Sequence, residues 1–327
     1  MHILLLGRMA TVAQQTIRAH LEAEHEISVI RDAADAPRAA HLFETAEVIV
    51  GGPLTRDLAA RARCLRLLQA PRAGLDNLGL EWLPPHVLVA NTFHHETSIA
   101  EHVLMAMLMF ARRPAEYDRE LRRGRWPGSC IWGEPPAMPV LEGASVMLLG
   151  LGHIAREITR RARAFGMRVI GVSRNSQPKE AQVDQLAGYD SWRDCLPAAD
   201  FLVPTCPLTP RTRGLIGREA FARMKPSAVL INVARAEIAD ERALFEALRD
   251  RVIAGAALDV WYQYPRLPDE VCPPSRFPFH ELPNVLLTPH VSGWTRQTVE
   301  GRARDIAENI NRLEKGLPLH NLVRRDD

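Results

Sequence analysis

The chain has 327 residues, of which 46% are hydrophobic and 24% charged, and its formal net charge at pH 7 is +2. This length predicts two domains with separate cores. So small a net charge argues against a nucleic-acid-binding protein. The arginine-rich stretches 122–125 and 160–163 are therefore interpreted as solvated helix faces. The five cysteines show no metal-type spacing, which predicts reduced thiols in a cytoplasmic protein. The opening apolar segment is too short for a signal peptide, and the longest apolar run, 103–111, is too short for a membrane span.

Strands and helices alternate along nearly the whole chain, which predicts an α/β fold with parallel sheets. Before residue 97 the pattern predicts strands at 2–7, 26–30, 47–50, 66–70 and 86–90, and a helix at 9–24. A long apolar helix is expected at 98–113, and the stretch 114–145, rich in Pro, Gly and Trp, is expected to be irregular. The later strands are predicted at 146–149, 168–172, 200–205, 228–233, 253–258 and 285–288, with helices at 155–165 and 295–315.

The turn after the strand 146–149 carries a glycine pattern, Gly150-Leu151-Gly152-His153-Ile154-Ala155. The first glycine permits a tight turn, the second lets a pyrophosphate approach the backbone, and the alanine allows close packing of helix on strand. The helix that follows offers N–H groups and its positive dipole end to phosphates. A bare glycine pattern is more often an ordinary turn. Between a buried strand and a helix it predicts dinucleotide binding, with contacts at Gly150, Gly152, His153 and Ile154.

The position of this motif in the middle of the chain predicts the domain organisation. Residues before it form a separate domain, which the C-terminal segment completes. We therefore expect a substrate domain made of 1–96 and 292–327, with a dinucleotide-binding domain, 97–291, inserted in it. Both are expected to be Rossmann-like, doubly wound parallel sheets.

Three polar residues follow predicted strands of the cofactor domain, at the edge where open α/β sheets bind ligands. The Arg235 guanidinium can grip a carboxylate with two hydrogen bonds, although a surface arginine would ordinarily pair with Glu237 or Asp240. Asp259 ends a second strand. His290 follows a third and is suited to proton transfer at neutral pH, although a single histidine is more often structural. Three such residues at three strand ends favour catalysis.

The chain resembles the D-isomer-specific 2-hydroxyacid dehydrogenases, a family of NAD(P)-dependent enzymes, from about residue 66 to about residue 315. The resemblance rests on the glycine turn and on the segments 72–77, 100–102, 232–244, 258–260 and 288–290. It implies hydride transfer between the nicotinamide and the carbon that bears the hydroxyl group. Arg235 is then expected to bind the substrate carboxylate and the reacting oxygen, and His290 to exchange the hydroxyl proton.

The resemblance also implies roles for residues around the reactants. Backbone amides at Ala73 and Gly74 would hold the substrate carboxylate, and His95 would contact the substrate from the rim of its domain. Asp259 would contact the nicotinamide amide. Cys206 falls where the family lines the nicotinamide pocket, although packing is the simpler role for it. The other expected cofactor contacts are Pro207, Val233, Ala234, Arg235, His290 and Gly293.

Tyr264 stands where the family usually has the Glu that pairs with the catalytic His. A carboxylate there would raise the pKa of His290 and fix its tautomer, whereas Tyr264 offers a hydrogen bond without charge at neutral pH. Glu270 or Glu281 is a possible substitute. The formate dehydrogenase branch of the superfamily also lacks that Glu and has similar Asp-Val-Trp and His-x-Ser-Gly pieces. The chain is short for that branch, and 91–95 lacks its formate-site pattern.

The end of the strand 168–172 predicts the cofactor. NAD enzymes place an acidic residue there to hold the ribose diol, but here Ser173 and Arg174 follow the strand, and no acid appears before Glu180. These two residues can bind a 2′-phosphate, whereas a carboxylate would repel it. The sequence therefore favours NADP as the cofactor, with NAD as the alternative.

The first hypothesis is a cytoplasmic, NADPH-preferring 2-ketoacid reductase that works as a homodimer, as its relatives do. No metal is predicted, because the adjacent His94 and His95 point in different directions and rarely ligate one ion. The rivals are a cofactor-sensing binding protein without turnover, suggested by the missing Glu, and formate-dehydrogenase-like oxidation of a small acid. Neither a nucleic acid nor a membrane is expected as a partner.

Overall fold

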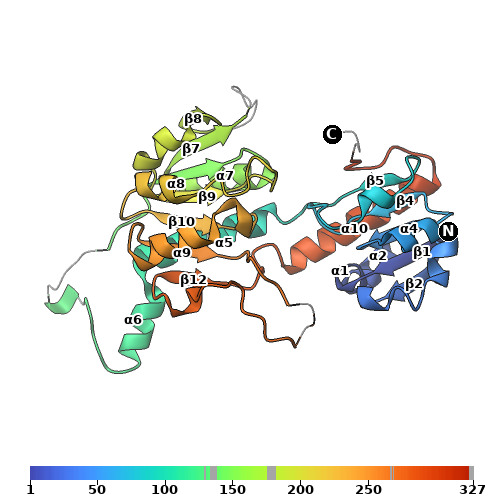
Figure 1. The fold of residues 1–327 in the computed structure, drawn as a ribbon, viewed down its shortest axis with the longest axis horizontal. Coiled ribbons are helices and arrows are strands. Elements are labelled where there is room, and N and C mark those ends of the chain that lie inside the picture. The colour runs from blue at the N-terminus through green and yellow to red at the C-terminus, as the bar shows by residue number, and fades with distance from the viewer. Residues whose placement is uncertain (129, 133–137, 175–181, 266, 268, 324–327) are drawn as a thin grey trace. The chain divides into compact units, whose positions relative to one another are not determined.

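The computed structural model describes residues 1–128, 130–132, 138–174, 182–265, 267 and 269–323. The chain divides into two compact units (Figure 1). Unit 1 consists of Met1–His94 and the chain from Thr295 onward, and unit 2 is the continuous segment His95–Trp294. Each unit is built on its own parallel sheet, which confirms the predicted α/β fold class with one Rossmann-like domain inserted in another.

Unit 1 contains five parallel strands in the order β2-β1-β3-β4-β5. Alternate residues of β1 enter two cores, with Leu4 and Leu6 on one face of the sheet and Ile3 and Leu5 on the other, so both faces are buried. The strands are β1 (His2–Leu6), β2 (Glu26–Ile30), β3 (Val48–Gly51), β4 (Leu67–Gln69) and β5 (Leu88–Ala90). The helices are α1 (Arg8–Val12), α2 (Gln14–His20), α3 (His41–Thr45), α4 (Arg56–Arg61) and α10 (Arg296–Glu314), with short turns η1 (Ala33–Asp35) and η2 (Leu80–Trp82).

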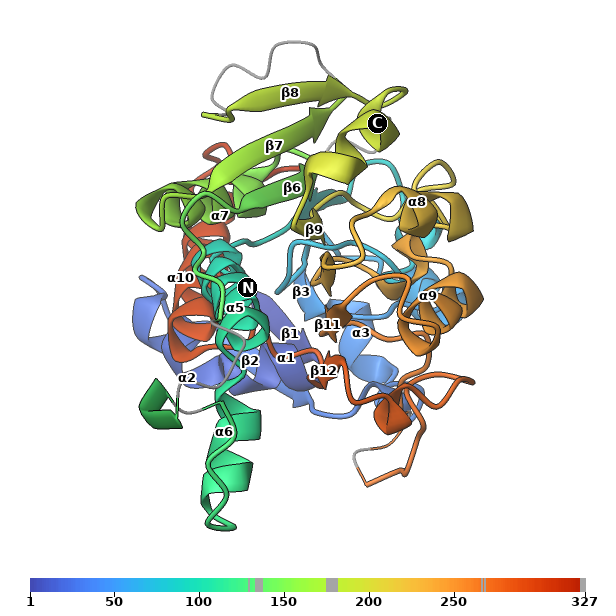
Figure 2. The same cartoon turned by 90° about the vertical axis from the view of Figure 1, so that its left-hand side faces the viewer.

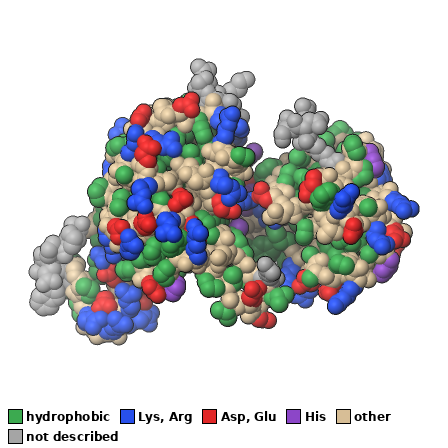
Figure 3. Space-filling model, viewed as in Figure 1, with side chains coloured by type: hydrophobic (Ala, Val, Ile, Leu, Met, Phe, Trp, Pro, Cys, Tyr) green, Lys and Arg blue, Asp and Glu red, His purple; other side chains and the backbone are tan. Residues whose placement is uncertain are grey.

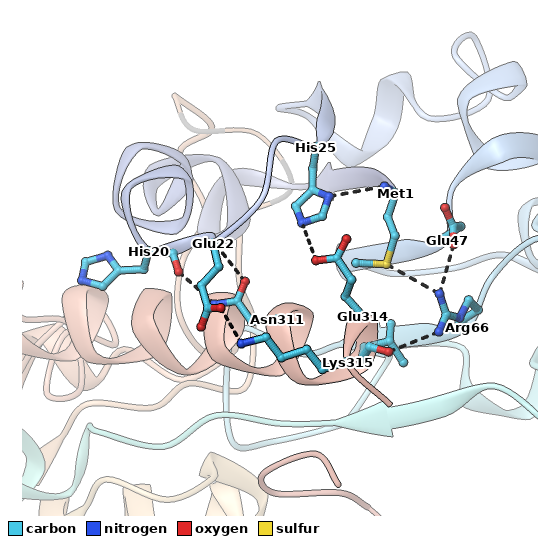
Figure 4. Close-up of polar contacts among 10 residues, drawn as sticks. Met1, His20, Glu22, His25, Glu47, Arg66, Asn311, Glu314 and Lys315 are labelled. Atoms are coloured by element: carbon cyan, nitrogen blue, oxygen red, sulfur yellow. Dashed lines mark hydrogen bonds and ion pairs between the residues drawn. The ribbon is translucent and has the colours of Figure 1, made fainter. Parts of the chain in front are cut away.

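Helix α10 joins the C-terminal segment to the N-terminal strands of unit 1. Its apolar side chains lie in the same core as Ile3 and Leu5. Polar contacts along α10 add to this packing (Figure 4). Asn311 donates to the backbone oxygen of His20 at 3.0 Å and accepts from the N–H of Glu22 at 3.1 Å, and Lys315 pairs with the Glu22 carboxylate. Unit 1 is therefore complete only when both parts of the chain are present.

Unit 2 contains seven parallel strands in the order β12-β11-β10-β9-β6-β7-β8, with β7 and β8 side by side at one end of the sheet (Figure 2). The order reverses between β9 and β6, and the carboxyl ends of strands at such a point form the usual ligand site of an open α/β sheet. The strands are β6 (Ser145–Leu149), β7 (Arg168–Ser173), β8 (Gln185–Gly188), β9 (Phe201–Pro204), β10 (Val229–Asn232), β11 (Gly255–Leu258) and β12 (Val285–Leu287).

Helices cover both faces of this second sheet. Side chains of α5 (Glu96–Arg112) and α7 (His153–Ala164) share one core with Val146 and Leu148, and those of α8 (Arg218–Arg223) and α9 (Glu241–Arg249) share the other with Met147 and Leu149. The remaining elements are α6 (Pro114–Leu121), η3 (Cys130–Trp132), η4 (Trp192–Ala198), η5 (Ala236–Ile238) and η6 (Phe279–Glu281). No helix in the described ranges combines the length and the apolar character that a membrane span requires.

The structure corrects three of the predicted elements. The helix expected at 9–24 is two short helices, α1 and α2, which meet at Ala13 and end at His20. Helix α6 forms inside the stretch expected to be irregular, because Pro114 has the backbone angle of a first helical residue. Strand β8 was not predicted: it buries only Ala187, so it lacks the apolar run of an inner strand.

Helix α6 buries none of its side chains, and Figure 3 shows Lys and Arg side chains (blue) gathered over it at the lower left. These charges are paired within the segment: Arg122 with Asp118 at 2.8 Å, and Arg123 and Arg125 with Glu120 at 3.2 and 2.5 Å. The three arginine side chains are 57–77% exposed, which fits a solvated helix face.

Candidate active site

The glycine turn joins β6 to α7, and a different physical reason requires a small residue at each of its positions 150, 152 and 155. Gly150 has a φ of +112°, and a Cβ there would lie 3.0 Å from the backbone of Cys206, in the loop after β9. A side chain at this position would therefore be excluded by backbone conformation and by space. Ala155 is fully buried where α7 packs on the sheet.

Gly152 meets the requirement for a phosphate cradle. It has extended backbone angles, and a Cβ there would meet no described atom within 4 Å, so the side chain is absent without any steric demand from the protein itself. Gly152 also caps α7 and, being a glycine, has no side chain to bond to the first amides of that helix. These amides and the helix dipole favour an anion. The turn thus fits the pyrophosphate of a dinucleotide.

Ser173 ends β7 and Arg174 follows it. Ser173 is half-buried and Arg174 is exposed at the carboxyl edge of the sheet, next to the glycine turn that ends β6. Glu180, the first acid after the strand, lies outside the described residues.

His290 and Tyr264 are in contact. The Tyr264 hydroxyl lies 2.9 Å from Nδ1 of His290, and the backbone N–H of Trp261 donates to the same hydroxyl at 3.0 Å. Burial raises the pKa of Tyr264 above its ordinary value, so the phenol keeps its proton at neutral pH. Besides the bond from Trp261, the Tyr264 oxygen can accept a hydrogen bond from Nδ1–H of His290, which leaves Nε2 as the nitrogen that takes up and releases a proton.

Asp259 holds the loop that carries His290. His290 has a φ of +57°, a left-handed conformation that residues other than glycine seldom adopt. The Asp259 side chain is buried and accepts three hydrogen bonds from this loop, from the Thr288 hydroxyl at 2.6 Å and from the amides of Val291 and Ser292 at 2.9 Å each. The structure thus shows the Asp259 carboxylate fixing the backbone around His290, while its contact with the nicotinamide amide stays a prediction.

The start of α5 supports the other side of this loop. The Ser98 hydroxyl donates to the Ser292 oxygen at 2.5 Å, and a Cβ on Gly293 would lie 3.4 Å from the Cβ of His95. His102, one helical turn further on, has its Nε2 3.5 Å from the Thr288 hydroxyl. Burial lowers the pKa of His102, which the Asp259 charge partly opposes. His95 and His102 thus belong to the surroundings of the His290 loop.

Arg235 follows β10 in a turn closed by Asn232. The buried Asn232 amide donates to the Arg235 oxygen at 3.0 Å, and its side-chain oxygen accepts from the Ala234 amide at 3.2 Å. The guanidinium donates to the Ala234 oxygen at 2.8 Å, and its charge acts on the Tyr264 hydroxyl, where it lowers the pKa against the larger effect of burial. The structure therefore brings Arg235 close to the Tyr264–His290 pair.

The ordinary partners considered for Arg235 have other contacts. Glu237 lies 3.8 Å from Arg213, and Asp240 caps α9 by accepting from the Ala243 amide at 2.8 Å.

The possible substitutes for the missing Glu also have partners of their own. Glu270 accepts from the Leu267 amide at 3.1 Å, and Glu281 lies 3.9 Å from His280.

The remaining predicted residues lie in several places. Ala73 and Gly74 are in the loop after β4 of unit 1, where Asn91 donates to the Ala73 oxygen at 2.8 Å. His94, also in unit 1, lies 2.9 Å from Asp305, so it and His95 have different surroundings. Burial raises the pKa of Cys206 to about 11, so its thiol stays protonated, as a packing role requires. The others, Pro207, Val233 and Ala234, follow β9 and β10.

Sequence reasoning did not single out Trp261 or Asn232. The Trp261 indole donates to the Thr288 oxygen at 2.8 Å, while its backbone serves Tyr264. Both residues stand next to predicted site residues in the chain, but an aromatic side chain after a buried strand indicates only a core, and an amide at a strand end indicates only a turn.

Comparison with protein families matches residues 104–292 to the family model described as "D-isomer specific 2-hydroxyacid dehydrogenase, NAD binding domain". A glyoxylate reductase of Thermococcus litoralis is 32% identical over 316 residues, which cover 94% of this chain and 92% of that protein. A D-3-phosphoglycerate dehydrogenase of Methanocaldococcus jannaschii is 33% identical over 286 residues, 86% of this chain but only 52% of the longer relative.

Solved structures agree with this result. A D-isomer specific 2-hydroxyacid dehydrogenase family protein from Aeromonas salmonicida superposes with a TM-score of 0.82 at 26% identity, over 99% of this chain and 98% of the other. An NADPH-dependent glyoxylate/hydroxypyruvate reductase from Sinorhizobium meliloti, in complex with NADP and sulfate, superposes with a TM-score of 0.79 at 26% identity, over 98% of each chain.

Proposed function

The chain belongs to the D-isomer specific 2-hydroxyacid dehydrogenase family, and from that premise we propose that it is an NADPH-preferring reductase of small 2-ketoacids. It is an NAD(P)-dependent oxidoreductase that interconverts 2-ketoacids and D-2-hydroxyacids. The observation that carries the residue assignment is the cluster of Arg235, Tyr264 and His290, since it supplies a cation, a proton carrier and an orienting hydroxyl in one unit.

In the reaction, the bound nicotinamide supplies or accepts the hydride. Arg235 binds the substrate carboxylate and polarises the reacting oxygen, which its planar guanidinium does with two parallel hydrogen bonds. His290 gives a proton from Nε2 to that oxygen during reduction and takes it back during oxidation. Tyr264 holds the imidazole through Nδ1. Amides at Ala73 and Gly74 of unit 1 and the side chain of His95 complete the proposed substrate contacts.

The preference for NADPH rests on Ser173 and Arg174. A hydroxyl and a guanidinium at the end of β7 suit a 2′-phosphate, whereas an acid that would hold a ribose diol and repel that phosphate is absent from the sequence at this point. The Sinorhizobium meliloti relative, which is NADPH-dependent, supports the same choice.

The substrate class follows from the relatives. Several of them are glyoxylate reductases, and one solved relative is a glyoxylate/hydroxypyruvate reductase, so we propose a 2-ketoacid with a short side chain. The test is NADPH oxidation with glyoxylate, hydroxypyruvate and a bulkier 2-ketoacid. We expect turnover that favours the two short substrates. NADPH binding without turnover of any ketoacid would instead indicate a cofactor-sensing protein, and oxidation of formate would place the chain with the formate dehydrogenases.

We further propose that the enzyme is a cytoplasmic homodimer. Five free cysteines support the location, since an oxidising compartment favours disulfides. Sedimentation of the purified protein at twice the mass of the chain is the expected result, and a monomeric mass contradicts it.

A further inference from the structure

Three arginines from separate segments of unit 2 converge on one tyrosine. Tyr189 follows β8, and the register of β7 with β8, which pairs Ser173 with Gly188, brings Tyr189 beside Arg174 as the two strands end. Arg193 lies in η4, with its guanidinium 4.8 Å from the centre of the Trp192 ring. Arg211 lies after β9, in a turn closed by the hydrogen bond from the Thr212 amide to the Thr209 oxygen at 3.1 Å.

The charges of these arginines act together at the Tyr189 hydroxyl. Burial and the nearby Cys206 raise the pKa of Tyr189, and the positive charges of Arg174, Arg193 and Arg211 oppose that rise. Cys206 is also the residue that packs against Gly150. The basic cluster therefore lies beside the glycine turn, on the side of β7 and β8.

Within the described ranges, no acidic group neutralises this cluster. Arg213, in the same loop as Arg211, lies 3.8 Å from Glu237. Asp194, which follows Arg193 in η4, pairs with Arg223 of α8 at 3.2 Å. Arg174, Arg193 and Arg211 form no such pair with a described residue.

The cluster also contains buried donors that lack an acceptor. The Tyr189 hydroxyl, the indole N–H of Trp192 and Nε of Arg193 are buried and have no hydrogen-bond partner in the described part of the chain. Buried donors in folded proteins nearly always have a partner, and leaving them without one is costly. Three guanidinium groups around a tyrosine, with donors that lack an acceptor beside them, favour an anion that is rich in acceptors.

We propose that Arg193 and Arg211, together with Arg174, bind the 2′-phosphate of NADPH. This inference rests on the proposed cofactor preference and adds to it two residues, one from η4 and one from the loop after β9. A phosphate monoester has three acceptor oxygens and close to two negative charges, so it can take hydrogen bonds from guanidinium groups on several sides. The Arg193 guanidinium is already oriented by its stacking on the buried Trp192.

The probes are 2′,5′-ADP and 5′-AMP, which differ only in the 2′-phosphate, titrated calorimetrically into the full-length protein. The wild-type protein is expected to bind 2′,5′-ADP more tightly than 5′-AMP. In Arg193→Gln and Arg211→Gln, binding of 2′,5′-ADP should weaken about three- to tenfold each, with binding of 5′-AMP unchanged, because one charge-assisted contact is lost. Arg213→Gln is the matched control, since Arg213 shares the Arg211 loop but pairs with Glu237.

The outcomes separate this inference from the cofactor preference. If Arg174→Gln weakens 2′,5′-ADP binding while Arg193→Gln and Arg211→Gln bind it like the wild type, the two added residues are wrong and the NADPH preference stands. If the wild-type protein binds the two nucleotides equally, the preference itself is wrong, and the phosphate site with it. Retained 5′-AMP binding in each variant shows that the fold is intact. The differences between variants should shrink as salt is raised.

Discussion

A hydroxyl, that of Tyr264, lies 2.9 Å from Nδ1 of His290, at the position where the resemblance to the family predicts a carboxylate. Burial raises the pKa of Tyr264, so the phenol stays uncharged through the neutral range and contributes no negative charge to stabilise an imidazolium. Reduction needs the protonated imidazole. We therefore expect reductive kcat/KM to fall as pH rises past neutral, while the oxidative direction improves. The measurement is the pH profile of kcat/KM in both directions.

Two variants at Tyr264 separate charge from orientation. Tyr264→Glu supplies a carboxylate that favours the imidazolium form of His290. The pH at which reductive kcat/KM begins to fall, the descending limb of the profile, should therefore move upward. Tyr264→Phe removes the hydrogen bond without adding charge, so it should lower kcat and leave the limb in place. A wild-type limb that already lies in the alkaline range would mean that another acid, Glu270 first, serves His290.

Arg235 is predicted to act on the substrate rather than on the dinucleotide. Arg235→Ala should lower kcat/KM by about 2–5 kcal/mol in transition-state binding, because a charge-assisted pair with the substrate carboxylate is lost. Cofactor affinity should be unchanged when titrated by nucleotide fluorescence. Arg213→Ala, which removes a nearby arginine paired with Glu237, is the control and should be fully active. Wild-type activity in Arg235→Ala would show that another group anchors the substrate.

The sequence was sufficient to predict a contact when both residues occupy positions that the family motifs define. Tyr264 and His290 were expected to meet because Tyr264 replaces a known partner of the catalytic His, and the structure brings them into contact. The cluster around Tyr189 could not be predicted, because Arg193 and Arg211 lie in different segments of the sequence and only the fold brings both charges to act on Tyr189. Nothing in their local sequence distinguishes them from solvated arginines.

At the scale of elements, a substitution in the turn between β6 and α7 can test whether this turn binds the dinucleotide without destabilising the fold. Gly152→Ala should leave thermal stability within about 1 kcal/mol of the wild type, because its backbone is extended and its Cβ meets no described atom. Dinucleotide affinity should fall, since the added methyl group occupies the approach of the pyrophosphate. The measurements are thermal unfolding and calorimetric titration with NADPH.

Gly150→Ala is the contrasting variant. Its φ of +112° and the 3.0 Å approach of Cys206 should make this substitution destabilising by about 1–3 kcal/mol, with loss of cofactor binding as a consequence. If Gly152→Ala binds NADPH as the wild type does, the pyrophosphate does not approach this turn.

The inner strands were predictable because they are apolar runs buried on both faces, as in β6 and β10. The two elements that were missed have weak patterns for physical reasons. Strand β8 lies at the edge of its sheet and buries one residue, and α6 packs none of its side chains on a core. Periodicity records burial, so elements with little burial leave little pattern.

At the scale of the whole molecule, each unit has two cores made only of its own residues. We therefore expect residues 95–294, produced alone, to unfold cooperatively and to be stabilised by NADPH, because this segment holds the glycine turn and the β7 end. It should not reduce ketoacids, since the proposed contacts at Ala73 and Gly74 are missing. Thermal unfolding with and without NADPH checks the first point and a turnover assay the second. Failure to unfold cooperatively would show that unit 2 needs unit 1 to fold.

The division of unit 1 between two distant parts of the chain has a consequence on the ribosome. Roughly 200 residues separate Ala90 from Arg296, so at about 5–20 residues per second α10 emerges about 10–40 s after β5. During that interval the face of the sheet that carries Ile3, Leu5 and Val48 has no helix α10 to cover it. We expect nascent chains stalled before α10 to be cleaved by protease within residues 1–94 while 95–294 resists, and to bind chaperones through the uncovered strands. Equal protection of both segments would mean that unit 1 folds without its last helix.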